Sequence, residues 1–206
     1  MININKTEEK PFANRKRIRL KEYDYSLPGY YFVTICTQNR QYLFGNIVNE
    51  KMALNEMGKI INQYWQKLPE KFNNVLLDEY IIMPNHLHGI IHIVGAGFSR
   101  PTETGFSRPT ETRFSRPKIS LEQIIAWFKY QSTKRINHVS NWSGKFINNG
   151  REDRAPTNKK QIFKKNWQRN YYEHIIRDEE ELNKIREYIV LNPHKWPEDK
   201  NNLRKK

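Results

Sequence analysis

The segment EYIIMPNHLHGIIHIV, from Glu79 to Val94, constrains the fold most strongly. It contains two apolar runs rich in β-branched residues, separated only by Pro84 and Asn85. Such runs predict buried strands. Because a parallel pair needs a crossover of a dozen or more residues, two strands joined so tightly are expected to pair antiparallel. The chain should therefore contain an antiparallel sheet.

The remaining hydrophobic patterns complete a single α+β domain. Runs of aromatic and β-branched residues predict strands, and apolar residues at three- and four-residue steps predict helices. In chain order we predict strand Tyr30–Gln38, helix Leu54–Leu68, strands Asn73–Pro84 and His86–Val94, helix Ser120–Asn137, strand Gln161–Ile176 and helix Asp178–Asn192. The β-α-β-β-α-β order is typical of the ferredoxin-like fold, here with an extra C-terminal helix.

Segments of biased composition set the expected boundaries of this domain. We predict a basic N-terminal arm over residues 1–28, one domain over 29–196 and a basic tail over 197–206. The octapeptide GFSRPTET occurs twice in succession from Gly97, inside a predicted disordered insertion over 95–118. Its Pro, Ser, Thr and Arg content cannot build a core. A polar, Gly- and Asn-rich stretch over 140–160 is predicted to be a second flexible loop.

The charge of the chain points to a polyanionic partner. Among 206 residues, 36 are Lys or Arg and 22 are Asp or Glu, which gives a net charge of +14. Together with 13% aromatic residues, this composition favours a nucleic-acid-binding protein. The single cysteine, Cys36, excludes an intrachain disulfide and a cysteine-based zinc site. No apolar run is long enough for a membrane span, and the N-terminus lacks a signal-peptide core.

A pair of histidines opens the second strand of the hairpin. His86 and His88 are two residues apart, so both side chains point to the same face of the strand. They can therefore bind one metal ion from one side. His92 lies on that face but farther along the strand. Zn, Mn, Ni or Fe suit two imidazoles, whereas a phosphate-bearing substrate would also suit Mn or Mg. The alternative is that both histidines are ordinary polar residues of a solvated sheet face.

The segments around these histidines resemble a known family. YIIMPNHLHGIIHIV is similar to the His–hydrophobic–His (HUH) motif of the single-tyrosine, IS200-like transposases. YYFVTICTQNR and WQRNYYEHIIRDEEELNKIREYIVLNPHKW resemble their REP-associated branch, so the similarity covers most of 19–196 without the two loops. The resemblance implies a ferredoxin-like protein that binds single-stranded DNA and nearby hairpins. It also implies that His86 and His88 hold Mg²⁺ or Mn²⁺ on the scissile phosphate, while a helical tyrosine attacks and forms a 5′-phosphotyrosine.

The position of the nucleophile departs from the expected pattern. We assign the tyrosine helix to Ser120–Asn137, where Tyr130 is the only tyrosine and points away from the apolar stripe. The motif alignment falls nearer Ser132. Tyr172 is the second candidate. In relatives, an amide one turn after the tyrosine is the third metal ligand, but that position here is Lys134.

Other residues remain open as ligands and DNA contacts. The candidate third ligands are Gln131, Asn137 and His174. Basic residues interleaved with aromatic ones suit phosphate contact and base stacking. The predicted DNA contacts are Lys129, Lys134, Arg135, Lys164, Lys165, Trp167 and Arg169.

Three functions follow from these patterns. The leading hypothesis is a transposase that cleaves and rejoins single-stranded DNA beside REP-type hairpins, in the bacterial cytoplasm, as a monomer or homodimer. The first alternative is a hairpin-binding module of the same fold that has lost cleavage. The second is a zinc-dependent hydrolase built on His86 and His88.

Overall fold

The computed structural model describes residues 23–95, 119–145 and 165–203, with side chains described up to residue 139 in the second range. Four strands form one antiparallel sheet in the order β4-β5-β1-β6. They are β1 (Gly29–Cys36), β4 (Val75–Met83), β5 (His86–Ile93) and β6 (Tyr172–Ile176). Each crossover skips one strand, as in the ferredoxin-like arrangement, so the predicted α+β fold is confirmed.

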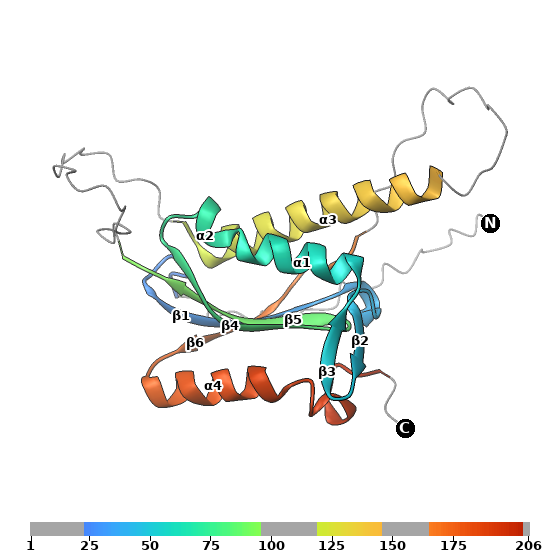
Figure 1. Ribbon diagram of the computed structural model, residues 1–206. Coiled ribbons are helices and arrows are strands. Elements are labelled where there is room, and N and C mark those ends of the chain that lie inside the picture. Colours follow the sequence, from blue (N-terminus) through green and yellow to red (C-terminus); the bar gives the residue numbers. More distant parts are fainter. Residues whose placement is uncertain (1–22, 96–118, 146–164, 204–206) are drawn as a thin grey trace, which may run out of the picture.

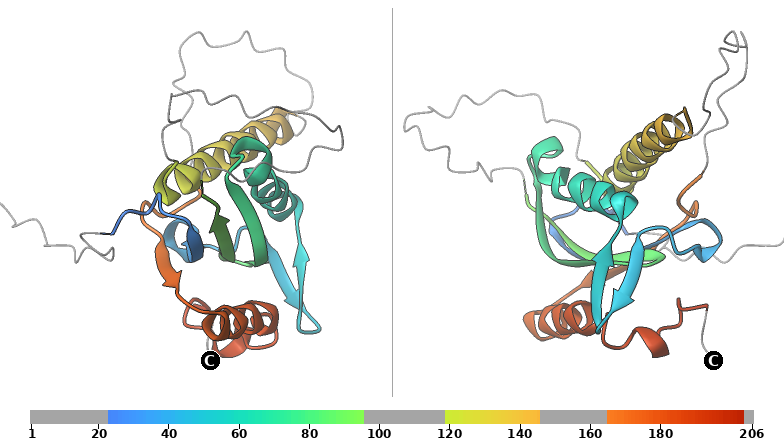
Figure 2. Two further views of the ribbon diagram at one scale, coloured as in Figure 1. Left: turned by 90° about the vertical axis from the view of Figure 1, so that its left-hand side faces the viewer. Right: turned by 45° about the vertical axis from the view of Figure 1, so that its right-hand side comes forward.

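Helices cover both faces of this sheet (Figure 1). On one face lie α1 (Glu56–Gln66), α2 (Leu68–Lys71) and α3 (Leu121–Lys145), and on the other lies α4 (Glu179–Leu191). Figure 2 shows the same three layers from two other directions. None of the described helices combines the length and hydropathy that a membrane-spanning helix requires.

The face under α1 and α3 holds most of the apolar core. Alternate residues of the central strands, including Val33, Leu87 and Ile91, pack there against Trp65 of α1 and Phe128 of α3. All five side chains are fully buried. Tyr25 belongs to the same cluster, so the predicted N-terminal arm over 1–28 is corrected: its described end packs into the domain.

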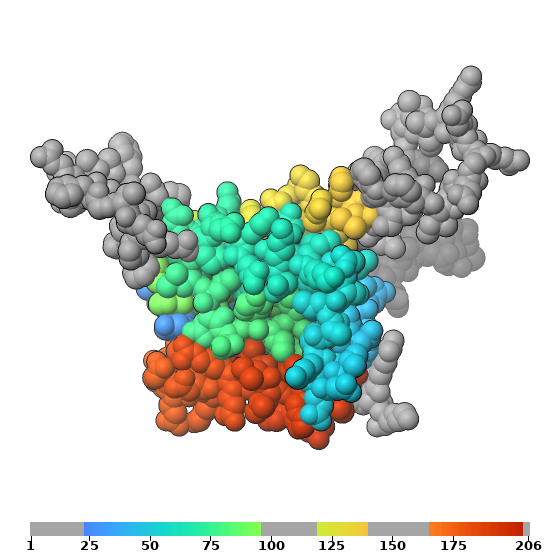
Figure 3. All heavy atoms as spheres, in the orientation of Figure 1, coloured from blue at the N-terminus to red at the C-terminus, as the bar shows by residue number. Residues whose placement is uncertain are grey.

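The face under α4 has a smaller apolar cluster and carries the polar site. Phe32, Ile90 and Ile176 of the sheet pack against Leu182 and Ile189 of α4. Figure 3 shows α4 directly beneath the edge strand β4. An Asp78–Arg186 ion pair joins these two elements, with nitrogen–oxygen distances of 2.8 and 2.6 Å.

Local signals set the ends of the helices. The side chain of Asn55 accepts a hydrogen bond from Gly58 N, and that of Asp178 accepts one from Glu181 N, so each caps its helix. Ser120 and Gln123 form the predicted capping box before α3, with backbone–side-chain distances of 3.0 and 3.5 Å.

Several predicted boundaries are corrected. The hairpin of β2 (Gly45–Val48) and β3 (Lys51–Leu54) was not predicted, and α1 begins after it. Its turn residues Asn49 and Glu50 have φ values of 48° and 60°, as hairpins of this type require. The helix predicted to end at Asn137 continues to Lys145, inside the stretch assigned to a flexible loop over 140–160.

The end of the chain is also organised differently from the prediction. The last strand begins only at Tyr172. Before it, Asn166 and Trp167 are buried, and among the described residues of this segment Trp167 makes an isolated bridge with Thr37. The predicted tail over 197–206 begins within the short 3-10 turn η2 (Trp196–Glu198). Asn201 is buried, so the described part of that segment belongs to the domain. The octapeptide repeats lie outside the described residues.

Candidate metal and nucleophile site

The tight turn between β4 and β5 fixes the first histidine. The Nδ2 group of Asn85 donates to the backbone carbonyls of Arg40 (3.2 Å) and Asn201 (2.7 Å), so its Oδ1 atom faces His86 Nδ1 at 2.8 Å. An amide oxygen only accepts hydrogen bonds, hence His86 carries its proton on Nδ1. The lone pair of His86 Nε2 is therefore left for a ligand.

The second histidine meets the first on the α4 face of the sheet. The Nε2 atoms of His86 and His88 are 2.9 Å apart, and His88 Nδ1 is 2.8 Å from Thr34 Oγ1. Both imidazoles are almost completely buried. Burial, with the positive charges of Arg40 and Lys200, lowers the pKa of His86 to about 3, and burial also places the pKa of His88 well below its usual value. Both rings are neutral at pH 7, as metal ligation requires.

A carboxylate from the C-terminal segment closes the site. Asp199 Oδ2 is 4.0 Å from His86 Nε2, and its side chain is 5% exposed. One ligand atom each from His86, His88 and Asp199 lies within 4.8 Å of the others. This spacing is close enough for the three residues to hold one metal ion. Two imidazoles and a carboxylate fit a divalent transition metal such as Mn²⁺.

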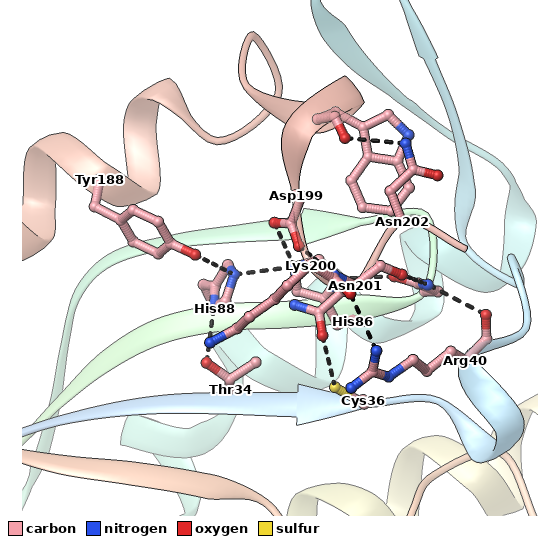
Figure 4. Close-up of polar contacts among 12 residues, drawn as sticks. Thr34, Cys36, Arg40, His86, His88, Tyr188, Asp199, Lys200, Asn201 and Asn202 are labelled. Carbon is pink, nitrogen blue, oxygen red and sulfur yellow. Dashed lines mark hydrogen bonds and ion pairs between the residues drawn. The ribbon is translucent and has the colours of Figure 1, made fainter. Parts of the chain in front are cut away.

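Helix α4 brings a tyrosine to the same point. The hydroxyl of Tyr188 is 3.3 Å from His88 Nε2, and Figure 4 shows Tyr188 and Asp199 both directed at the histidine pair. Burial and the Asp199 carboxylate raise the pKa of Tyr188, whereas a hydrogen bond from the Asn192 side chain lowers it. The site thus combines two neutral imidazoles, a carboxylate and a phenol.

Asn192 supplies a further oxygen beside the tyrosine. It lies one helical turn after Tyr188 and is 2% exposed. Its Oδ1 atom is buried, and among the described residues it has no hydrogen-bond partner. The same amide contacts Tyr188, so its unpaired Oδ1 atom lies next to the site. A buried oxygen atom without a hydrogen-bond partner is suited to bind a metal ion.

No known protein-family model matches the chain. A protein of Haemophilus influenzae, described only as uncharacterized, is 38% identical over 186 residues, which span 90% of this chain and 92% of that protein. The chain belongs to the same family as that protein. A solved structure of a REP-associated tyrosine transposase bound to a REP hairpin covers 86% of this chain and 73% of its own, with a TM-score of 0.50 and 16% identity. This likeness shows that the two proteins share a fold.

The structure separates the predicted nucleophile from the histidines. Tyr130 is 64% exposed on α3, whose apolar residues pack on the opposite face of the sheet. Gln131 and Asn137 are also on α3, so neither reaches the histidine pair. These assignments are therefore corrected. A tyrosine and an amide four residues apart, as the resemblance implies, occur at Tyr188 of α4 and at Asn192, the residue that caps the end of this helix.

The second candidates lie on the face of the histidines but not at the site. Thr34 pairs with His88 on one side and with Tyr172 on the other, so Tyr172 is two strands from His88. His174 Nε2 is 2.6 Å from a carboxylate oxygen of Glu181. This hydrogen bond gives His174 a partner away from the metal cluster.

The predicted DNA contacts divide into internal and exposed groups. Lys129 Nζ donates to the carbonyls of Gln168, Arg169 and Asn170 at 3.0–3.3 Å, which holds the segment before β6. Trp167 is 5% exposed and donates to Ser132 Oγ at 3.0 Å, so it cannot stack on a base. Both roles are corrected. Exposed positions are Lys134, Arg135, Lys165 and Arg169, and Lys164 lies outside the described residues.

Proposed function

We propose that this protein is a metal-dependent DNA strand transferase with Tyr188 as its nucleophile. It would cleave and rejoin single-stranded DNA beside hairpins of the REP type. The convergence of the Tyr188 hydroxyl on the His86–His88 pair carries the proposal. The motif resemblance and the shared fold support it, and the net charge of +14 favours a polyanionic substrate.

Residues of this chain would hold the metal. The Nε2 atoms of His86 and His88 and the carboxylate of Asp199 form the ligand set, with Asn192 Oδ1 as an additional oxygen. We propose Mn²⁺ or Mg²⁺, because a phosphate oxygen would complete an oxygen-rich coordination shell. A bound ion would act there as a Lewis acid on the scissile phosphate.

Tyr188 would carry out the covalent step. Its oxygen attacks the phosphorus, the bond from phosphorus to the 3′ oxygen breaks, and the strand is left with a free 3′-hydroxyl and a 5′-phosphotyrosine. The tyrosyl ester conserves the bond energy, so the reverse attack by a 3′-hydroxyl rejoins a strand without ATP. The hydrogen bond from Asn192 stabilises the negative charge that develops on the tyrosine oxygen.

The test is a search for the covalent adduct. Full-length protein is incubated with Mn²⁺ and hairpin-bearing single-stranded DNA, and products are separated on a denaturing gel. We expect an adduct with the wild-type protein and with Tyr130→Phe, and none with Tyr188→Phe. Tyr130→Phe is a matched control because it removes an exposed hydroxyl from the other face. An adduct with Tyr188→Phe would contradict the assignment.

A zinc-dependent hydrolase is the second candidate. The His86, His88 and Asp199 set provides the three protein ligands that hydrolytic zinc sites use. Such an enzyme would use water, so DNA would be cut without an adduct and Tyr188→Phe would retain cleavage. Binding to DNA without any cleavage would instead support the other alternative predicted from the sequence, a hairpin-binding module that has lost cleavage.

A further inference from the structure

One group of exposed and half-buried side chains near the histidines is not used by the chemistry described above. It consists of Tyr172 on β6, Arg40 on the short 3-10 turn η1 (Gln38–Arg40) and Lys200. Tyr172 is 48% exposed and lies on the α4 face of the sheet, across Thr34 from His88. Neighbouring strands are about 4.8 Å apart, so its backbone is about 10 Å from that of His88.

Two side chains, Phe32 and Lys200, lie against the ring of Tyr172. Phe32 contacts the tyrosine ring edge-on, with ring centres 6.3 Å apart and planes at 70°. Lys200 Nζ lies 6.0 Å from the centre of the same ring. Figure 4 shows the Lys200 side chain extending across the histidines toward Thr34. An aromatic ring is thus held in place beside a cation on the open side of the site.

The backbone that carries both cations is tied to the metal site. Arg40 Nη1 donates to the carbonyl of Lys200 at 3.1 Å. The carbonyls of Arg40 and Asn201 accept from Asn85, the residue that orients His86. Arg40 also has a φ of 51°, a backbone conformation that is rare outside glycine. These contacts connect the segments that carry the two positive charges to the histidine pair.

We infer that Tyr172, Lys200 and Arg40 form a subsite for the nucleotide next to the cleaved phosphate. An unpaired base stacks on Tyr172, and the two cations contact the phosphates that flank it. Proteins that bind single-stranded nucleic acid commonly combine aromatic stacking with a positively charged groove. Asp199 is the acidic group of the site, and its carboxylate oxygen Oδ2 lies 4.0 Å from His86 Nε2. The inference rests on the proposed function for the position of the strand.

The experiment combines base-stacking and salt measurements. The cleavage position is first mapped from the wild-type adduct, and a fluorescent adenine analogue is then placed at each neighbouring position of the single strand. Binding is measured in the Tyr188→Phe background, where the strand stays intact. We expect quenching at one position, and we expect Tyr172→Leu to remove it and weaken binding roughly tenfold. Tyr172→Phe, which keeps the ring, restores both.

Matched variants on the opposite face isolate the subsite. Tyr130→Leu removes a tyrosine that is more exposed than Tyr172 and should leave the quenching and the affinity unchanged. Lys200→Ala should reduce the slope of log K against log salt by about 0.7, the value for one phosphate contact on a single strand. Lys71→Ala, an exposed lysine of α2, should not change it.

The outcomes separate this inference from the proposed function. In one outcome, the wild-type protein forms an adduct while Tyr172→Leu shows the same fluorescence quenching and the same DNA affinity as the Tyr188→Phe protein. This result would refute the subsite and leave the strand-transferase proposal intact. If no adduct forms with any strand, the proposed function fails. Loss of the adduct in Tyr172→Phe, with Tyr188 intact, would overturn the inference because it would make Tyr172 the nucleophile.

Discussion

On the face covered by α1 and α3, the central strands present Val33 and Leu87, fully buried among apolar groups. On the face covered by α4, the same two strands present Thr34, His86 and His88, joined to one another by hydrogen bonds. The period of two along a strand allows both faces to be specified by one sequence. The α1–α3 face therefore mainly stabilises the domain, while the α4 face positions the side chains of the candidate site.

This division predicts that stability and activity respond to different substitutions. The α1–α3 face holds the large aromatic residues Trp65 and Phe128, whereas the apolar cluster under α4 is smaller and stops where the histidines begin. A substitution on the α1–α3 face should mainly lower the stability of the protein and have little direct effect on the site. A change at the histidines should remove function while the core persists.

The largest expected effect is on cleavage by the histidine variants. His86→Ala and His88→Ala should each abolish Mn²⁺ binding and cleavage, because each removes one of two adjacent ligand nitrogens. DNA binding should remain largely intact, since it depends on many basic residues. Calorimetry measures Mn²⁺ binding, and a gel-shift assay measures DNA binding separately.

His92→Ala is the control for this comparison. His92 is on the same strand and the same face, but its ring stacks on Tyr30 with centres 4.0 Å apart. It takes no part in the metal cluster of the described residues. We expect normal cleavage from this variant. Full cleavage by His86→Ala or His88→Ala would refute the metal assignment.

A smaller effect, on stability, is expected at the glycine between the histidines and the core. A Cβ atom on Gly89 would lie 2.5 Å from Trp65 Cζ2 and 3.1 Å from Tyr80 Cβ. Gly89→Ala should therefore lower the free energy of unfolding by about 1–3 kcal/mol through overpacking. Gly95→Ala, whose Cβ would meet Pro28 Cγ at 3.4 Å, should cost far less. Denaturant titration compares them, and equal stabilities would show that Trp65 can move aside.

The strands and helices could be predicted from the sequence because their patterns are local. The two apolar runs of the hairpin and the capping box at Ser120 identified elements that the structure contains. The hairpin at Gly45–Leu54 was missed because its strands are only four residues each and largely exposed, so they leave little hydrophobic signal.

The site was predicted only where one motif contained it. His86 and His88 are neighbours in sequence, whereas Asp199 reaches them through tertiary structure from a segment that resembles a basic tail. Tyr188 was overlooked because the nucleophile was assigned to α3, although its spacing to Asn192 offered a signal. Which face of the sheet a helix covers depends on the path of the whole chain, and hydrophobic periodicity does not reveal it.

The smallest predicted effect concerns how α4 is held against the sheet. Arg186 forms a two-pronged pair with Asp78, and this contact lowers the pKa of the Asp78 carboxyl below its usual value near 4. The pair therefore stabilises the fold at neutral pH, and the stabilisation is lost as the pH falls below about 4 through the folded-state pKa.

Asp78→Asn tests this attachment of the α4 face. It should lower the free energy of unfolding by on the order of 1 kcal/mol at pH 7, and the difference from the wild type should shrink as the pH falls below about 4 through the lowered folded-state pKa of Asp78. Glu180→Gln is the control on the same helix, because its pair with Lys184 is mostly exposed and should contribute less. Since α4 carries Tyr188, Asp78→Asn should also slow adduct formation at neutral pH while leaving Mn²⁺ affinity unchanged. A pH-independent difference in stability would show that packing, and not the ion pair, attaches α4 to β4.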